Sequence, residues 1–443
     1  MIASQSIKEG TSRSDGLQRF LEASALIGFS RTNQRWPGRA ATNIDLIALW
    51  KRERAVSPLL NERFVACINS FLQDGNEESS PVALLADENR AFVGVALHGD
   101  GFVLTTSEAT ALIEADQKNA NVVRPFLIGD DLNGRPDLSP SRYAIDFGEM
   151  DEDEAREYTA PYRIVNEQVF PSRATNNRPT YKTYWWRFGE RRVNLHYTIR
   201  EISRYLVVAK TSKHLSFEFL TGLQFVLDQS LTVLPLTEDH EWCVVQSSIH
   251  EAWARRFSSN QGGTPRYNAT TALQNYPFPD ASMYAKPEKY QQLCAKYLSV
   301  RKILRHSLWL GLTDIYNLFH TRDLTPGEVA RVSKKPLSET EAGYQGILEL
   351  RRLHRELDIA VRDAYGWTDL DLGHDFVEVE TLPENDRVRY TISPAARKEV
   401  LKRLLAENHK RAALQAQTAD ASAPAKKKRG KKAAGSDGNE ELF

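Results

Sequence analysis

The segment of residues 180–279 constrains the fold most, because strand-like and helix-like patterns alternate within it. Residues 205–210 are apolar and β-prone, whereas residues 239–257 repeat apolar side chains at the spacing of an amphipathic helix. The side chains on that apolar stripe are Trp242, Val245, Ile249, Trp253 and Phe257. The alternation predicts a mixed α/β domain, and the stripe places both of its tryptophans in the core.

Composition places the chain among ordinary globular proteins. With 443 residues, 41% hydrophobic and 26% charged, it is long enough for two or three domains, each with its own core. The cysteines at 67, 243 and 294 lie far apart, which indicates neither a zinc site nor a disulfide framework and favours a reducing compartment such as the cytoplasm. No run of about 18 apolar residues occurs, so no membrane span is expected.

The net charge is zero, but the charges are distributed unevenly. Residues 108–159 hold 13 acidic and 5 basic residues, a net of −8, whereas residues 172–214 hold 10 basic and 2 acidic residues, a net of +8. Adjacent segments of opposite sign can form a dipolar surface that orients a polyanion such as DNA. They can equally pair with each other, and the sequence leaves both possibilities open.

Four regions are expected along the chain. Residues 1–60 show a strand–helix–strand–strand pattern with a polar loop at 10–16, which is too small to bury both faces and has the form of the closing elements of a larger α/β domain. Residues 61–285 form a second, mixed domain that includes a turn-rich loop at 123–136. The helical region, 286–412, carries helices at 287–306, 338–365 and 394–414, and a disordered basic tail follows at 413–443.

Several motifs, taken in order, resemble the C-terminal half of type IIG and MmeI-like restriction–modification DNA adenine methyltransferases. The matching motifs include Glu-Gly-Thr-Ser-Arg at 9–13, Trp-Pro-Gly-Arg-Ala at 36–40, Pro-Phe-Leu-Ile-Gly-Asp-Asp-Leu-Asn at 125–133, Trp185-Trp186, Gln-Ser-Ser-Ile-His-Glu-Ala-Trp at 246–253, Pro-Phe-Pro at 277–279 and Leu-Asp-Leu-Gly-His at 370–374. The resemblance implies an α+β fold. Residues 1–60 would be the end of a Rossmann-like methyltransferase domain, 61–285 a target recognition domain and 286–412 a helical C-terminal region.

The same resemblance implies motifs that this sequence lacks. Such enzymes methylate an adenine flipped out of the duplex, using S-adenosylmethionine, a glycine-rich turn and an Asn-Pro-Pro-Tyr loop. No Pro-Pro pair occurs in the chain, and the glycines at 99–101 and 262–263 stand in neither the right context nor the right order. We therefore expect the DNA-binding specificity part of a split or truncated methyltransferase, with the cofactor and the catalytic residues on a separate N-terminal half.

Basic residues in and near the central segment are the candidates for contact with double-stranded DNA, because arginine reads guanine edges and both cations bind phosphates. The candidate DNA-binding residues are Lys182, Arg187, Arg191, Arg192, Lys213, Arg255, Arg256 and Arg266, with Arg173 and Arg178 as further candidates. For each of them the alternative is a solvated surface charge. On a helical wheel, Arg255 points away from the apolar stripe and Arg256 lies beside it.

No catalytic or metal-binding residue is expected in the chain. His250 has no partner carboxylate at a fixed spacing, and the dense carboxylates at 130–131 and 149–153 are typical of solvated loops and helix starts. Two other functions stay open, a standalone nucleic-acid-binding or interaction protein (or an inactive relic) and a hydrolase with an unrecognised site. The basic run at 426–432 is typical of a nuclear import signal or a nonspecific polyanion anchor.

Overall fold

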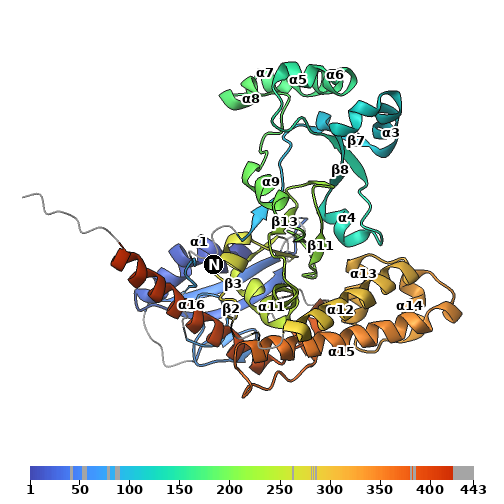
Figure 1. Cartoon of the computed structure of the whole chain (residues 1–443). Helices are drawn as coiled ribbons and strands as arrows, with labels where there is room; N and C mark the ends of the chain where they lie inside the picture. Colours follow the sequence, from blue (N-terminus) through green and yellow to red (C-terminus); the bar gives the residue numbers. More distant parts are fainter. Residues whose placement is uncertain are drawn as a thin grey trace, which may run out of the picture.

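The computed structural model of the chain describes residues 1–39, 43–51, 57–76, 80–84, 90–261, 264–280, 282, 284, 287–379, 382 and 386–422. An N-terminal sheet and a group of helices form a lower body, and a lobe of short helices around a small sheet stands above it (Figure 1). Two long helices, α12 (Pro287–Leu308) and α15 (Glu341–Ala364), extend to one side of the body. Helices and several mixed sheets together confirm the α+β class.

The N-terminal region forms a five-stranded sheet packed against short helical segments. The strands β2 (Leu26–Arg35) and β3 (Asn43–Trp50) pair antiparallel, and the strand–helix–strand–strand pattern expected of residues 1–60 is present. The sheet has the order β1-β3-β2-β4-β5, completed by β1 (Ile2–Ser4), β4 (Leu59–Leu60) and β5 (Arg63–Phe64). The helical segments are η1 (Gln5–Lys8), α1 (Gly10–Ser12), η2 (Arg13–Gln18) and α2 (Arg19–Glu22).

The prediction of a polar loop at residues 10–16 is wrong, because these residues are helical. Leu17 is buried in the core of the N-terminal sheet. The buried guanidinium of Arg13 donates to Ser70 Oγ at 2.8 Å and lies over the ring of Phe71, 4.0 Å from its centre. These tertiary contacts stabilise a helical conformation that a glycine- and serine-rich segment does not favour by itself.

The upper lobe has its own hydrophobic core. Its sheet has the order β12-β8-β9-β7, in which β8 pairs parallel with β12 and antiparallel with β9. Trp185 and Trp186 are buried in this core. The lobe and its sheet comprise η4 (Asp100–Phe102), β7 (Val103–Thr105), α3 (Thr106–Ala115), η5 (Gln117–Asn121), β8 (Val123–Leu127), α4 (Gly129–Gly134), β9 (Arg142–Ile145), α5 (Glu152–Arg156), α6 (Thr159–Gln168), α7 (Phe170–Ala174), α8 (Pro179–Thr183) and β12 (Val226–Leu227).

The prediction of a turn-rich loop at residues 123–136 is also wrong, because β8 and α4 occupy this stretch. Val123, Phe126 and Leu127 are buried, and β8 has a neighbouring strand on each side. Burial of these side chains and pairing with two strands outweigh the local turn preference of the Pro, Gly, Asn and Asp residues around them.

A second four-stranded sheet joins the lobe to the helices of the body. Its strands pair antiparallel in the order β11 (Glu218–Leu220), β10 (Tyr205–Ala209), β13 (Leu231–Leu234) and β6 (Phe92–Val93). Alternate residues of β10 pack on opposite faces, one with α9 (Val193–Arg200) and the other with Trp242 and the helical region. Because both faces are covered, the strand is apolar throughout, as its sequence indicates.

The single helix expected at 239–257 is two helices, α10 (Asp239–Gln246) and α11 (Ser248–Phe257). Ser247 separates them in an extended conformation, and its hydroxyl accepts from the backbone N–H of His250 at 3.2 Å as the N-cap of α11. The backbone N–H of Ser248 donates to Asp358 Oδ1 at 2.7 Å. A serine cap and a distant carboxylate thus satisfy the donors that a continuous helix would have used. The strands β14 (Ser259–Gln261) and β15 (Thr264–Arg266) and the turn η6 (Ala269–Gln274) follow.

The helical region confirms the three predicted long helices. α12 packs along α15, where Gly343 and Gly346 permit close approach, since an added Cβ would lie 2.6 Å from a Leu308 methyl and 2.8 Å from a Leu304 methyl. The third long helix, α16 (Pro394–Ser422), continues through alanine-rich residues 413–422, which are therefore helical rather than disordered. The basic run at 426–432 lies outside the described residues. The remaining elements are α13 (Leu312–Phe319), α14 (Pro326–Ser333), η8 (Leu337–Glu339) and the antiparallel hairpin of β16 (Asp375–Glu378) and β17 (Val388–Thr391).

A buried ion-pair cluster connects the second sheet to α12. Glu218 Oε1 lies 2.9 Å from Arg305 Nη1, and Glu218 Oε2 lies 3.2 Å from Arg301 Nη2. Burial disfavours the charged form of Arg301, but the carboxylate of Glu218 and nearby tyrosines outweigh this effect and raise its pKa. The cluster compensates two buried cations with one carboxylate.

We expect Glu218→Gln to lower the free energy of unfolding by about 3 kcal/mol, because loss of one partner leaves buried charges uncompensated. Urea unfolding followed by tryptophan fluorescence measures this change. The matched control is Glu328→Gln, which breaks the exposed pair with Arg331 and should cost less than about 1 kcal/mol. Equal effects of the two substitutions would contradict a stabilising role for the Glu218 cluster.

Candidate nucleic-acid interface

Several of the predicted DNA-binding arginines bind backbone carbonyl groups inside the protein. Arg173 is buried and donates to the carbonyl oxygens of Leu97 at 2.9 Å and of His98. Burial lowers its pKa. Arg187 donates to the carbonyl oxygens of Met150 at 2.7 Å and of Glu149 at 2.9 Å. Both guanidinium groups therefore fix loops of the upper lobe.

Arg255 and Arg256 are also engaged within the body. Arg255 pairs with Glu251 at 2.6 Å, and its side chain is only 8% exposed although the helical wheel directs it away from the apolar stripe. Arg256 lies 3.6 Å from the centre of the Phe71 ring and donates to Gln73. The wheel misses the burial of Arg255, because the loop at Lys213 packs over it and accepts a hydrogen bond through its carbonyl oxygen.

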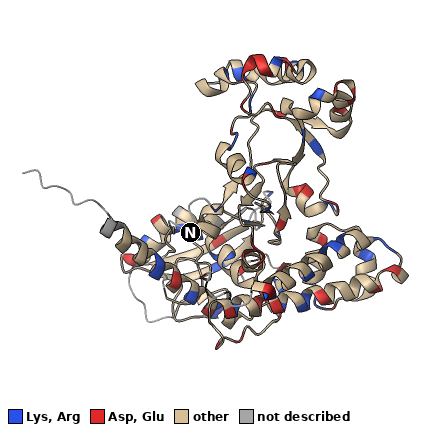
Figure 2. Cartoon of the chain, viewed as in Figure 1, with Lys and Arg blue, Asp and Glu red and all other residues tan. Residues whose placement is uncertain are grey.

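Two further candidates are partly exposed but have carboxylate partners. Arg191 pairs with Glu149 at 2.7 Å, and Lys213 pairs with Asp386 at 2.9 Å. The first pair joins the basic segment 172–214 to the acidic segment 108–159, so the two segments of opposite charge do contact each other. Both signs of charge are also interspersed over the whole molecule (Figure 2).

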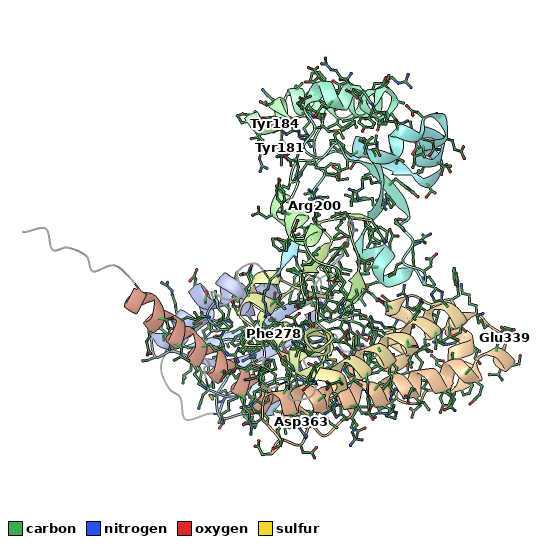
Figure 3. The ribbon with its side chains drawn as sticks, in the orientation of Figure 1. Tyr181, Tyr184, Arg200, Phe278, Glu339 and Asp363 are labelled. Carbon is green, nitrogen blue, oxygen red and sulfur yellow. The ribbon has the colours of Figure 1, made fainter. Side chains whose placement is uncertain are left out.

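Two candidates stay exposed on the upper lobe. Lys182 projects from α8, and Arg178 precedes that helix and donates to the hydroxyl of Tyr181 at 3.1 Å. Figure 3 shows Tyr181 and Tyr184 on the lobe, and Arg200 at the end of α9 where the lobe joins the body. Arg178 and Lys182 are therefore the exposed cations of this helix.

The structure brings Arg192 and Arg266 together with Lys210, and these three residues are termed the cationic cluster. Lys210 follows β10, and its carbonyl oxygen accepts from Tyr267 N at 2.6 Å. A bridge between Thr211 and Arg266 aligns the two segments. Arg192 is the N-cap of α9 in a left-handed conformation, with φ 54°. Three elements distant in sequence therefore place their cations at the junction of lobe and body.

The electrostatics of the cationic cluster favour an anion. Burial, followed by repulsion from Arg266 and Arg192, lowers the pKa of Lys210, and Asp228 and Glu190 oppose this shift. Glu190 is already paired with Arg192. Arg266 is exposed, with no side-chain partner among the described residues. The sequence prediction missed Lys210, although its place at the end of a buried strand, before a polar turn, was a usable signal.

Other predicted roles can be compared directly with the structure. Trp242 and Trp253 are fully buried core residues, as predicted. His250 is also fully buried, and its Nε2 lies 3.0 Å from Tyr267 OH, which indicates a structural role. Asp131 accepts from Ser141 N at 2.9 Å and stabilises a turn. Among the described residues, no group of three or more His, Cys, Asp or Glu side chains is placed to hold a metal ion. No helix in the described parts of the chain is long and apolar enough to cross a membrane.

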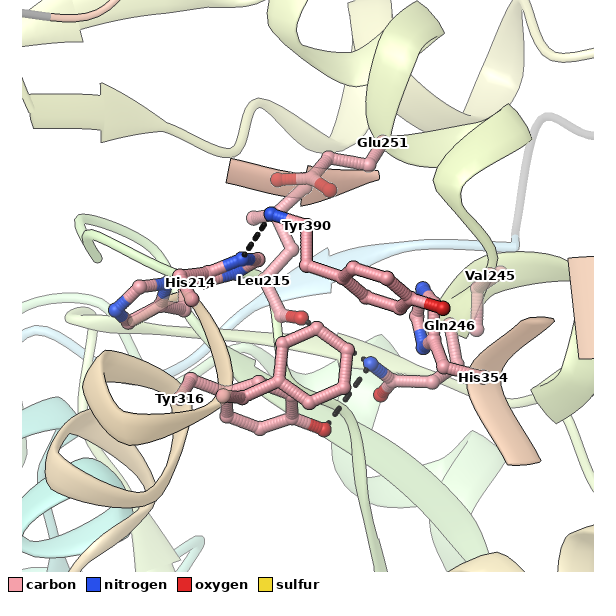
Figure 4. Close-up of a pocket in the computed structure, with 10 residues that line it drawn as sticks. His214, Leu215, Val245, Gln246, Glu251, Tyr316, His354 and Tyr390 are labelled. Atoms are coloured by element: carbon pink, nitrogen blue, oxygen red, sulfur yellow. Dashed lines mark hydrogen bonds between the residues drawn. The ribbon is translucent and has the colours of Figure 1, made fainter. Parts of the chain in front are cut away.

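A buried polar network lies where α11, α13, α15 and β17 meet (Figure 4). Ser248 Oγ lies 3.0 Å from His354 Nε2, and Asp358 lies one turn further along α15. This is not a nucleophilic triad, because Asp358 binds Ser248 N and His374, while His354 Nδ1 binds a tyrosine hydroxyl. The cavity is about 20 Å³, room for roughly one water molecule. This network therefore gives no support to a serine-hydrolase site.

The network predicts a loss of stability at low pH. Burial lowers the pKa of His214, His320 and His354, and lowers that of His250 to about 3. The unfolded histidines titrate near 6.5. Below that pH the unfolded state binds more protons, so each buried histidine lowers the free energy of unfolding by about 1.4 kcal/mol per pH unit.

Urea unfolding between pH 7.5 and pH 4.5 should therefore show stability falling as the pH drops through 6.5. His250→Gln should make this dependence shallower by roughly one proton. His306→Gln, at an exposed site on α12, should leave the dependence unchanged. A pH-independent free energy of unfolding across this range would refute the assignment of these histidines as buried and neutral.

Comparison with known proteins identifies the fold. A scan against models of protein families and a search of curated proteins gave no match. Among solved structures, the chain matches the type IIL restriction-modification enzyme MmeI, solved in complex with DNA, with a TM-score of 0.66 and 17% identity. The match covers 93% of this chain and 49% of that chain, so this chain spans about half the length of MmeI. The chain therefore has the fold of part of a restriction-modification enzyme.

Proposed function

We propose that this chain is the DNA-binding specificity part of a restriction–modification adenine methyltransferase, and that the cationic cluster binds the backbone of double-stranded DNA. The observation that carries the proposal is the likeness over 93% of the chain to a protein solved in complex with DNA. The cluster supports it, because three cations from separate elements converge with incomplete neutralisation. Phosphate contacts of this kind position a duplex, while base contacts made elsewhere supply specificity.

We expect the combined substitutions Arg192→Gln, Lys210→Gln and Arg266→Gln to weaken binding of a duplex at least about ten-fold near 0.1 M salt. The slope of log affinity against log salt should become shallower by about 2.7, since each lost phosphate contact removes about 0.9. Fluorescence anisotropy with a labelled duplex over a series of salt concentrations measures both quantities.

The matched control is Lys289→Gln, Lys296→Gln and Lys302→Gln on the exposed face of α12. It removes the same three charges and should leave the affinity and the salt slope near their wild-type values. Equal losses in the two triple variants would show that only net charge matters and would refute the cluster as the contact site. No binding of any duplex by the wild-type chain would refute the proposed function itself.

The proposal assigns methyl transfer to a catalytic half outside this sequence. The sequence holds neither a Pro-Pro pair nor a glycine-rich turn in the right context. The N-terminal sheet would be the end of the Rossmann-like methyltransferase domain, and its edges expose apolar side chains that a partner can cover. Ile2 on β1 is 61% exposed and Phe64 on β5 is 72% exposed. S-adenosylmethionine would bind to the catalytic half.

We expect no calorimetric binding of S-adenosylmethionine to the isolated chain. The adjacent upstream reading frame is expected to encode the glycine-rich and Asn-Pro-Pro-Tyr motifs. Its protein product, when added, should assemble with this chain, and the complex should bind the cofactor. Phe64→Glu should weaken this assembly, whereas Leu337→Glu, at a comparably exposed site on the helical region, should not. Cofactor binding by the chain alone would exclude the split arrangement.

A further inference from the structure

A surface pocket lies next to Lys213, where the turn after β10 meets α13 and the β16–β17 hairpin. Its volume is about 430 Å³, and Val388 is the single apolar residue among those that line it. The pocket therefore suits a charged ligand better than an apolar one. Its charged residues are Lys213, Arg322, Asp386, Arg387 and Arg389.

The cations of this pocket outnumber the carboxylate that neutralises them. Asp386 is shared, since it pairs with Lys213 at 2.9 Å and also with Arg389. Arg322 and Arg387 each donate to a backbone carbonyl group, and neither forms an ion pair within the described part of the chain. Among the described residues, these two guanidinium groups line the open pocket without pairing with a carboxylate.

Arg389 is a buried member of the same group. Its side chain is 4% exposed, and its Nε has no hydrogen-bond partner among the described residues. Burial and repulsion from Arg255 lower the pKa of Arg389 to about 10, although Asp386 opposes this shift. An anion in the pocket would stabilise the charged guanidinium, because it adds the attraction that a single shared carboxylate leaves incomplete.

The pocket also lies close to the cationic cluster along the chain. Lys210 of the cluster and Lys213 of the pocket are three residues apart, which a peptide chain spans in at most about 11 Å. The charges of one DNA strand repeat about every 3.4 Å along the helix axis. The backbones of Lys210 and Lys213 therefore lie within a distance that about three nucleotides of one strand span.

We propose that the pocket around Arg322 and Arg387 is a phosphate oxyanion site that holds a backbone phosphate of the DNA duplex beside the cationic cluster. The planar forks of two arginines suit the paired oxygens of a phosphodiester. The identity of the ligand rests on the proposed function, because the same oxyanion chemistry would also bind free phosphate. The β16–β17 hairpin thereby becomes part of the DNA-binding surface.

The test combines Arg322→Gln with Arg387→Gln in the full chain and leaves Asp386 and Arg389 in place. The double variant should bind a labelled duplex at least about ten-fold more weakly near 0.1 M salt, with a salt slope shallower by about 0.9, because one phosphate contact is lost. Asp386→Asn removes the competing carboxylate and should instead tighten binding. Lys296→Gln with Lys302→Gln, which removes the same charge from α12, should change neither quantity.

Unchanged affinity and slope in the double variant, while the wild-type chain binds DNA, would overturn the site. If the wild-type chain binds no DNA, the proposed function fails. Binding of inorganic phosphate then tests the pocket as an oxyanion site independently. Thermal stabilisation by phosphate in the wild type, lost in the Arg322/Arg387 variant, would retain an oxyanion site with free phosphate as its ligand. An equal response of the two proteins to phosphate would overturn it.

Discussion

The packing of the second sheet against the helical region depends on the buried ion pairs of Glu218 with Arg301 and Arg305. Glu218 stands on β11, and α12 presents Arg301 and Arg305 one turn apart, so that both guanidinium groups reach it. Without it, two cations would be buried against the sheet with no counter-charge, a cost larger than the packing of one apolar side chain returns. Trp242 packs in the large core that continues across this junction, and the Arg301 guanidinium lies 5.8 Å from the centre of its ring.

Several arginines of this protein bind groups in its interior rather than at its surface. Arg351 donates to three carbonyl oxygens, including that of Phe319 at 2.8 Å, and so caps the end of α13. Arg173 and Arg187 bind loop carbonyls of the upper lobe in the same way. A planar group with five donors in a fixed fork can satisfy several separate carbonyls at once, whereas a lysine offers three donors on a single nitrogen. A count of basic residues along the sequence therefore overstates the positive charge that a polyanion would meet.

The sequence predicts the features that depend on local patterns, but not those that depend on contacts between distant residues. The long helices and β10 follow from periodicity, and the burial of Trp242 and Trp253 follows from their stripe. The break at Ser247 does not, because it depends on a carboxylate of α15, 110 residues away in the chain. The helix at 10–16 depends on contacts of Arg13 with residues 70 and 71. For the candidate interface, Arg192 and Arg266 were named from sequence, but their meeting with Lys210 arises from strand pairing that no local pattern encodes.

The place where those three cations meet has a mechanical consequence. Bridges between Val95 and Asp228 and between Ala96 and Glu190 join distant chain segments beside the cationic cluster. At Gly94 an added Cβ would lie 2.1 Å from the carbonyl oxygen of Asp228, so the two backbone segments are in direct contact there. Repulsion among the cations opposes this close assembly, and a bound polyanion removes the opposition. An anion that neutralised the cluster would therefore remove a destabilising repulsion from this part of the fold.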